Sequence, residues 1–246
     1  MSPTPPTINL VHLARVTSTM DVLDELIADG APDWTVVLAD KQTGGLGRAG
    51  RSWDARPGSS LLCSILVRPP FAADRMGMLA IGVGVAIATC VERLGARVEL
   101  KWPNDVLLGG RKLAGILIRT RSGATGVVAN VGIGLNLIGT PREHTVRAAL
   151  DEATETTPNA AALAVELASS LAQLLTLADI SGIRDAWRER AALVGETVVV
   201  GDGERTVTGK LVGIDDHGAL LIEGDDGDRH AIVAGDLVRG PRAEAG

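Results

Sequence analysis

Three short segments of the chain bring together residue types that can do chemistry. The first, residues 45–53, is rich in glycine and carries Arg48 and Arg51. Glycine lets backbone N–H groups approach an anion closely, and the arginine guanidinium matches carboxylate or phosphate oxygens with paired hydrogen bonds. The segment therefore predicts a loop that binds an anionic ligand, although a solvated surface loop would have a similar composition.

The spacing of Gly45, Gly47 and Gly50 also matches the G-x-G-x-x-G pattern of dinucleotide-binding folds. That pattern needs a helix immediately after the third glycine. Here the chain continues through Arg51 to Pro57 with residues typical of a loop, so the sequence argues against a Rossmann fold. A P-loop is excluded too, because no glycine is followed by lysine and then serine or threonine.

The second segment ends a predicted strand with Lys101 and Trp102 and continues with Asn104 and Asp105. A cation, an indole, an amide and a carboxylate at one strand end can hold a nucleotide through its phosphate, base and hydroxyl groups or through Mg²⁺. The alternative is that the amide and carboxylate only cap a turn. Lys112 begins the next strand. If its side chain points inward, it needs an anionic ligand to offset the cost of burying its charge. If its side chain points outward, it is an ordinary exposed lysine.

The third segment, residues 132–136, places Gly132 and Gly134 inside a predicted strand and ends at Asn136. Glycine within a strand often marks the close approach of a ligand or of another backbone. The asparagine would then supply hydrogen bonds to that ligand. Taken alone, however, the segment is equally well explained by packing.

The composition limits the class of protein to which these segments belong. With 46% apolar and 22% charged residues the chain is typical of a globular protein, and its net charge of −6 argues against non-specific binding to nucleic acid or to an anionic membrane. Cys63 and Cys90 are too few for a disulfide scaffold or a zinc site and suit a reducing cytoplasm. Residues 1–7 are not a secretory signal, and the uncharged, mainly apolar stretch of residues 76–91 is shorter than a bilayer-spanning helix.

Hydrophobic spacing predicts an α+β fold with a mixed β-sheet rather than repeated βαβ units. Ser18 or a neighbouring threonine can cap a helix that begins near Met20 and ends at Gly30. After Gly195 the pattern changes to short β runs separated by turns, which predicts a small barrel and two domains, residues 1–194 and 195–246. The other predicted helices cover residues 72–94, 160–177 and 183–193; the predicted strands cover residues 34–39, 60–67, 98–102, 106–108, 113–119, 127–137, 197–200, 206–214, 219–223 and 229–233.

Together these segments resemble the biotin protein ligases, the biotin–[acetyl-CoA-carboxylase] ligases. The most specific part is the Lys-Trp-Pro-Asn-Asp run of residues 101–105, followed from Lys112 by Lys-Leu-Ala-Gly-Ile-Leu. The resemblance covers almost the whole chain and includes Ser18-Thr19, Gln42-Thr43, residues 45–53, 101–105, 111–117 and 132–136, and Gly213-Ile214-Asp215 with Gly218.

The resemblance implies a class II synthetase-like catalytic domain followed by a small SH3-like β-barrel. It also implies a reaction in two steps. Biotin and ATP first form biotinyl-5′-AMP and diphosphate, and a lysine of the biotin carboxyl carrier domain of an acyl-CoA carboxylase then takes the biotinyl group. Mg²⁺ is expected to be held mainly by the phosphates of ATP, without a dedicated set of protein ligands.

The same resemblance assigns roles to individual residues. Lys112 and Arg48 are the expected catalytic residues. The expected biotin-binding residues are Ser18, Thr19, Met20, Gln42, Gly45, Leu46, Gly47, Arg48, Lys112, Gly115, Gly132 and Gly134. The expected ATP- and adenylate-binding residues are Arg48, Arg51, Trp53, Lys101, Asn104, Asp105, Lys112 and Asn136.

Three positions depart from the pattern that the family usually shows. Leu46 replaces the first arginine of the loop, Met20 replaces an asparagine, and Arg119 replaces a glutamate. Leu46 and Met20 leave open a non-catalytic sensor of biotin or biotinyl-AMP. A lipoate or octanoate ligase of related fold is a further alternative, although it would not need the polar residues expected around the biotin ring.

The resemblance also carries expectations about partners. Only 17 residues precede Ser18, too few for the DNA-binding domain of some relatives, so we expect no DNA binding. We further expect no membrane association, a cytoplasmic protein, and a monomer or homodimer. The C-terminal module is expected either to contribute to ATP or carrier docking through residues 209–218 or only to stabilise the catalytic sheet.

Overall fold

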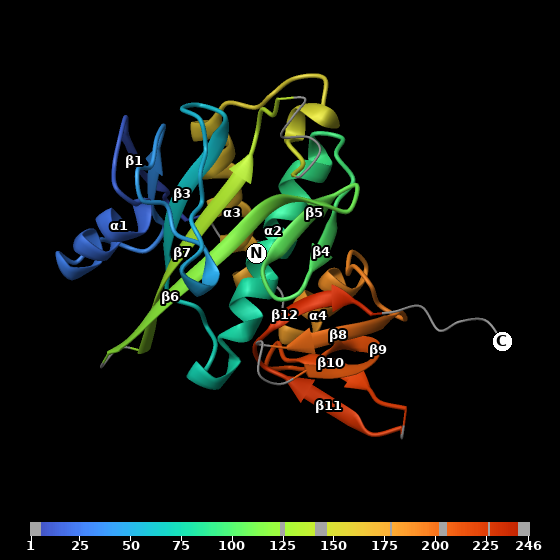
Figure 1. The fold of residues 1–246 in the computed structure, drawn as a ribbon. Coiled ribbons are helices and arrows are strands. Elements are labelled where there is room, and N and C mark those ends of the chain that lie inside the picture. Colours follow the sequence, from blue (N-terminus) through green and yellow to red (C-terminus); the bar gives the residue numbers. More distant parts are fainter. Residues whose placement is uncertain are drawn as a thin grey trace.

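The computed structural model describes residues 6–123, 126–140, 147–177, 179–201, 206–225 and 227–240. Its larger sheet is mixed, as predicted, with only the outer pair β1 and β2 running parallel (Figure 1). The strand order is β1-β2-β3-β7-β6-β5-β4. The strands are β1 (Asn9–Leu13), β2 (Thr35–Ala39), β3 (Ser60–Val67), β4 (Glu99–Lys101), β5 (Asp105–Leu108), β6 (Arg111–Gly123) and β7 (Gly126–Asn136).

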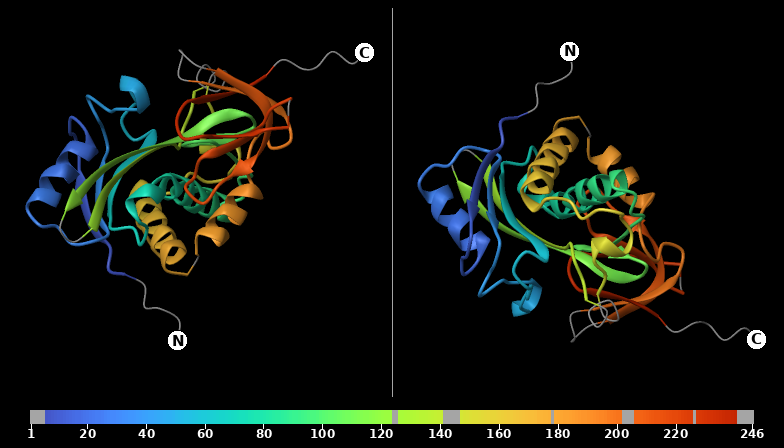
Figure 2. Two further views of the ribbon diagram at one scale, coloured as in Figure 1. Left: turned by 90° about the horizontal axis from the view of Figure 1, so that it is seen from below. Right: turned by 90° about the horizontal axis from the view of Figure 1, so that it is seen from above.

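Helices cover both faces of this sheet. α1 (Thr19–Ala28) lies on one face, and α2 (Gly77–Arg93) and α3 (Ala160–Leu177) pack on the other (Figure 2). α4 (Ile180–Arg188) packs against α2. None of the helices among the described residues is long and apolar enough to cross a membrane. The predicted buried core helix is α2, most of whose side chains are buried.

Two predicted helices have different ends, and one strand of the larger sheet was missed. α2 begins at Gly77 because residues 73–75 form a separate 3₁₀ turn. α4 begins earlier than predicted because Asp179 caps it, with Oδ1 accepting from the Gly182 N–H at 2.8 Å. It ends earlier because the backbone of Arg190 and Ala192 hydrogen-bonds to Leu100 of β4. The unpredicted strand is β1, which forms an edge of the sheet.

The C-terminal residues form a second, antiparallel sheet, consistent with the predicted SH3-like module. Its strand order is β11-β10-β9-β8-β12, and among the described residues no pairing joins β11 to β12 to close it into a barrel. The last strand was not predicted. The strands are β8 (Thr197–Gly201), β9 (Thr206–Ile214), β10 (Leu220–Glu223), β11 (Arg229–Ile232) and β12 (Asp236–Arg239).

The second sheet packs tightly against the larger sheet and its helices. The Trp102 indole Nε1–H donates to the Gly218 carbonyl at 3.0 Å, and a Cβ on Gly77 would lie 2.4 Å from the His217 carbonyl oxygen. Apolar residues of both sheets belong to one continuous buried core. The division between residues 194 and 195 therefore stays a prediction, although the second sheet begins at Thr197.

Candidate active site

A cavity of about 460 Å³ lies over the strands β6 and β7, on the face that α1 also covers. The N-terminus of α1 and the glycine-rich loop form part of its wall, and residues of β12 in the second sheet line one side. The loop, the strands and the C-terminal sheet, which are far apart in the sequence, therefore meet at one site.

A buried network of hydroxyl and amide groups forms one end of the cavity. The Thr19 backbone N–H and side-chain hydroxyl both donate to Gln42 Oε1, at 2.7 and 3.1 Å. The same hydroxyl lies 2.8 Å from Ser64 Oγ, and Ser64 is fully buried. Because Thr19 occupies the Gln42 oxygen, the Gln42 Nε2 amide is the group that this network presents as a donor at the cavity wall.

Ser18 has a structural role at the same end. It is the N-cap of α1, and its Oγ accepts from the Met20 backbone N–H at 3.3 Å. The helix-cap prediction is thus confirmed, and the cap fixes the first turn of the helix beside the cavity.

The strand glycines are covered by side chains of this chain. A Cβ on Gly134 would lie 2.4 Å from the Trp53 ring, and one on Gly115 would lie 3.0 Å from it. A Cβ on Gly132 would lie 2.8 Å from the Met20 sulfur. In this structure Trp53 and Met20 make the close approaches to these glycines, and the expectation that a ligand also lies against them stays a prediction. The Trp53 Nε1–H is buried and has no hydrogen-bond partner among the described residues.

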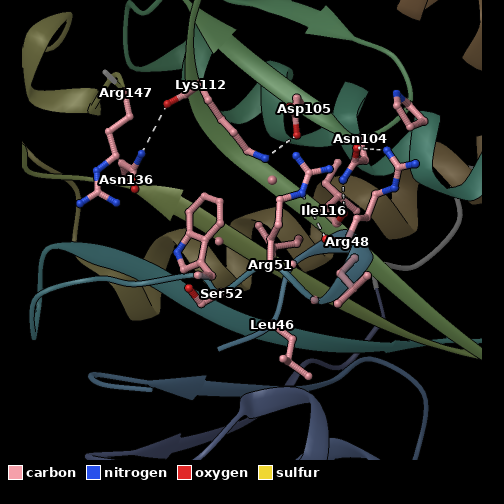
Figure 3. A pocket seen from close by; sticks show the side chains of 18 of the residues that line it. Leu46, Arg48, Arg51, Ser52, Asn104, Asp105, Lys112, Ile116, Asn136 and Arg147 are labelled. Atoms are coloured by element: carbon pink, nitrogen blue, oxygen red, sulfur yellow. Dashed lines mark hydrogen bonds and ion pairs between the residues drawn. The ribbon is translucent and has the colours of Figure 1, made fainter. Parts of the chain in front are cut away.

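The Lys112 side chain points into the cavity (Figure 3), so the first of the two orientations considered from the sequence is the one that the structure shows. Its Nζ forms an ion pair with Asp105 Oδ1 at 2.6 Å and lies 5.6 Å from the centroid of the Trp53 ring (Figure 3). Asn136 lies nearby, and its Nδ2 donates to the Ala148 carbonyl at 2.9 Å. Asp105 therefore orients the lysine that the sequence singled out.

The two loop arginines reach across the mouth of the cavity. Arg48 donates from Nη1 to Asn104 Oδ1 at 3.1 Å and from Nη2 to the Gly235 carbonyl at 3.2 Å. Arg51 Nη2 lies 3.1 Å from Asp236 Oδ2. The loop is therefore not an isolated solvated segment, because it contacts both the catalytic sheet and the C-terminal sheet.

All but one of the predicted site residues line this cavity. The exception is Gly45, where a Cβ would lie 2.6 Å from the Trp53 carbonyl oxygen, so this glycine serves packing within the loop. The predicted residues that line the cavity are Ser18, Thr19, Met20, Gln42, Leu46, Gly47, Arg48, Arg51, Trp53, Lys101, Asn104, Asp105, Lys112, Gly115, Gly132, Gly134 and Asn136.

The departures from the family pattern have separate places. Leu46 lies at the cavity with 45% of its surface exposed, whereas Met20 is buried. Arg119 does not line the cavity; it donates to Asp21 and Asp24 of α1 at 2.8 and 3.0 Å. Only the first two departures can therefore act directly on a ligand in the cavity.

Sequence reasoning missed several lining residues, most of all in the C-terminal sheet. The expectation for this sheet centred on residues 209–218, but its lining residues are Asp236, Leu237 and Val238. Gly218 instead fastens the sheet to Trp102. A single carboxylate in a short strand carries no distinctive pattern, so the sequence held no signal for it. Arg147 also lines the cavity and donates to the Asp54 carbonyl at 3.0 Å.

The titratable groups of the site limit its chemistry. Among the described residues, no three histidine, cysteine, aspartate or glutamate side chains gather closely enough to hold a metal ion. The buried Cys63 also lines the cavity, but burial raises the pKa of its thiol to about 12. This thiol is protonated at neutral pH and is a poor nucleophile. The cations, amides and hydroxyls are thus the groups available to bind and stabilise anions.

Comparison of the sequence with known proteins assigns this chain to a family. Residues 12–136 match the Biotin/lipoate A/B protein ligase family, and residues 193–240 match the Biotin protein ligase C terminal domain. A biotin–[acetyl-CoA-carboxylase] ligase of Paracoccus denitrificans is 36% identical over 93% of this chain and 99% of its own length. One from Mycobacterium tuberculosis is 34% identical over 92% of this chain and 87% of its own length.

Solved structures agree with these relatives. The biotin protein ligase from Aquifex aeolicus in complex with biotin and ATP superposes with a TM-score of 0.79 at 26% identity, covering 94% of this chain and 99% of that chain. The catalytic sheet and the C-terminal sheet both lie within this match. The chain therefore belongs to the biotin/lipoate A/B protein ligase family and, within it, to the biotin protein ligases.

Proposed function

We propose that this chain joins biotin to ATP as biotinyl-5′-AMP and transfers the biotinyl group to a lysine of a carrier protein, using the cavity over β6 and β7. One observation carries the proposal: Lys112, Arg48 and Arg51 converge on a cavity whose other end is the buried Thr19–Gln42 network. The cations suit two anionic substrates, and the network suits a small polar ring.

The first step brings two anions together. A carboxylate oxygen of biotin attacks the α-phosphorus of ATP, and the bond to the leaving diphosphate breaks. Lys112 and Arg48 are the proposed catalytic residues because cations offset the repulsion between the substrates and the charge that develops at phosphorus. Asp105 holds the ammonium of Lys112 at 2.6 Å and so positions it in the cavity.

Mg²⁺ is a proposed participant in this step. The carboxylate of Asp105 lines the cavity but is paired with Lys112. This donor set suits a metal ion held mainly by the phosphates of ATP rather than by protein side chains. When bound, the ion would neutralise phosphate charge, as metal ions do in phosphoryl transfer.

The proposed biotin end is the buried network. The Gln42 amide N–H and the Ser18 hydroxyl supply polar groups for the ureido ring, and Met20 supplies an apolar wall. The backbone of Leu46 and Gly47 and the glycines of the strands complete this end. The apolar side chain of Met20 can pack against a ring but donates no hydrogen bond, so affinity rests on the groups around it.

The proposed adenylate end is the part around Trp53 and Asn136. The indole ring lies against Gly115 and Gly134 of the strands, where it can stack on a base. Asn136 can pair with the base, and Arg51 and Lys101 add positive charge for phosphates. Asn104 orients Arg48 by accepting its Nη1–H.

The second step needs a neutral amine and an environment poor in water. The ε-amino group of the carrier lysine attacks the carbonyl carbon of the mixed anhydride, the bond to the phosphate oxygen breaks, and AMP leaves. The loop over the cavity excludes competing water. The names of the relatives from P. denitrificans and M. tuberculosis support the carrier of acetyl-CoA carboxylase as the second substrate.

The decisive experiment is biotin-dependent exchange between ATP and diphosphate, with lipoate and octanoate run in parallel. Exchange with biotin alone is the expected result. Exchange with lipoate or octanoate instead would select the related acyl ligases. Biotin binding without any exchange would select a sensor and contradict the proposed enzyme.

A further inference from the structure

The tip of the glycine-rich loop is held together by its own hydrogen bonds. The Gly47 N–H donates to the Arg51 carbonyl at 2.7 Å, and the Trp53 N–H donates to the Gly45 carbonyl at 2.9 Å. Leu46 and Ser52 form a β-bridge across the loop. The loop tip is therefore a compact unit, and its two arginines reach the far side of the cavity.

The far side is the C-terminal sheet. Arg51 Nη2 lies 3.1 and 3.3 Å from the two carboxylate oxygens of Asp236, and Arg48 Nη1 lies 3.7 Å from Oδ1 of the same carboxylate. Arg48 also donates to the Gly235 carbonyl. One carboxylate of the second sheet thus faces both loop arginines.

The position of Asp236 is defined by its own sheet rather than by the loop. Asp236 pairs with Gly201 of β8, and the next residue, Leu237, is buried. The turn before it needs glycine, because Gly235 has a φ of +141° and a Cβ there would lie 3.0 Å from the Gly201 carbonyl oxygen. A firmly placed carboxylate is therefore presented to the two arginines of the loop.

We propose that Asp236 is a positioning residue that holds the loop closed over biotinyl-5′-AMP between the two steps. The Asp236 and Arg51 side chains are 60% and 63% exposed, so their ion pair adds little to folding and can break when substrates enter. The ion pair instead shifts the equilibrium between the closed and the open conformation of the loop. This inference rests on the proposed function, because it concerns retention of the intermediate that the enzyme makes.

An open loop has a chemical consequence that can be measured. Biotinyl-5′-AMP that escapes meets water or a foreign amine, which attacks its carbonyl carbon while the bond to the phosphate oxygen breaks and AMP leaves. Escape therefore appears as intermediate trapped outside the enzyme. The ratio of escaped intermediate to biotin transferred to the carrier does not depend on the overall rate.

The test measures this ratio with hydroxylamine as the external trap and a purified biotin carboxyl carrier domain as the acceptor. Asp236→Asn and Asp236→Ala both remove the charge at an exposed position. We expect each to raise the ratio about two- to fivefold, the factor that an exposed ion pair can contribute. Asp236→Glu keeps the carboxylate and should restore a ratio near that of the unchanged protein.

The control is a second ion pair between the C-terminal sheet and the catalytic part. Asp216 pairs with Arg184 of α4 at 2.5 Å, its side chain is 54% exposed, and neither residue lines the cavity. Asp216→Asn should leave the ratio unchanged. Arg48→Gly, which removes a loop arginine itself, serves as the positive control and should raise the ratio most.

Each result supports or contradicts the proposed role of Asp236 in holding the loop closed. An unchanged ratio in Asp236→Asn and Asp236→Ala, beside a raised ratio in Arg48→Gly, would overturn the role of Asp236. A lowered ratio would mean that Asp236 competes with the substrates, and an equal rise in Asp216→Asn would point to general loosening; both contradict the proposal. If Arg48→Gly does not raise the ratio, the loop is not a lid. Failure of the unchanged protein to form any adenylate would instead reject the proposed function.

Discussion

The two ends of the cavity are built in different ways. At one end, Thr19 and Ser64 are buried and hydrogen-bonded, and they carry no charge. At the other, Arg51 and Asp236 are charged and largely exposed. A buried polar network holds its geometry because leaving any member unpaired is expensive, whereas an exposed ion pair is weak and easily broken. We infer that the buried end selects the substrate and that the exposed end controls access.

The largest expected effect comes from Lys112, which lies between the two ends. Lys112→Ala should lower adenylation about 100-fold or more, the scale of losing a charge that stabilises a transition state. The free energy of unfolding should change little, because the side chain is 41% exposed. Diphosphate exchange and thermal unfolding measure the two quantities. The exposed Lys210 of β9 provides the control Lys210→Ala, and a near-normal rate in Lys112→Ala would contradict its catalytic role.

A second substitution tests whether the strand position that contacts the Trp53 ring must be glycine. Gly134→Ala places a Cβ 2.4 Å from the indole ring, so the ring must move. We expect adenylation to fall about tenfold or more, mainly through weaker ATP binding, because stacking on an aromatic ring contributes on this scale. The control is Gly82→Ala in α2, where the nearest atom lies at an ordinary 3.7 Å. Equal activity of the two variants would show that the position of Trp53 is unimportant.

A third substitution tests the buried end. Ser64→Ala removes the hydroxyl that lies 2.8 Å from Thr19 Oγ1 and so loosens the amide of Gln42. Loss of one buried hydrogen bond, about 1 kcal/mol, corresponds to a rise of about fivefold in KM for biotin with a smaller change in kcat. Ser169→Ala is the control, because Ser169 only bonds within α3. If KM for ATP rises instead, the buried network does not belong to the biotin end.

A smaller effect is expected at Leu46, whose side chain is exposed although its backbone belongs to the proposed biotin end. Leu46→Arg restores the charge that the family usually has there, and the side chain is 45% exposed, so the fold should accept it. Activity should stay within about twofold or rise, since an added exposed charge has little effect. Steady-state kinetics with biotin and ATP provide the measurement. A severe loss would mean that this loop contacts its ligand differently from the family pattern.

The smallest effect concerns the thiols of the two cysteines. Burial raises the pKa of Cys63 to about 12, and mainly burial raises that of Cys90 to about 11. Because the thiolate is the reactive form, the buried Cys63 is almost entirely in its unreactive thiol form at pH 8. A thiol reagent should therefore label the native protein very slowly and both cysteines at once after unfolding. Rapid labelling of native Cys63 would show that the buried end opens to solvent.

Local pattern was enough for several elements. The predicted strand over residues 60–67 and the predicted helix over residues 160–177 coincide with β3 and α3. Both are predominantly apolar segments whose type depends little on distant residues. By contrast, β1 and β12 are short strands at the ends of their sheets. Such strands form only when a partner strand is present, and the sequence alone does not reveal that partner.

For the site, the sequence determined the chemical groups and the short segments that carry them. Lys112 and Arg48 were expected from local motifs, Gln42 was expected from the family resemblance, and all three line the cavity. Tertiary structure decided which group each one meets. Arg51 and Asp236 are 185 positions apart, and no local propensity links them. Ion pairs and close contacts over glycine depend on distances in space, so only the folded chain could place Asp236 at the mouth of the cavity and Trp53 on its floor.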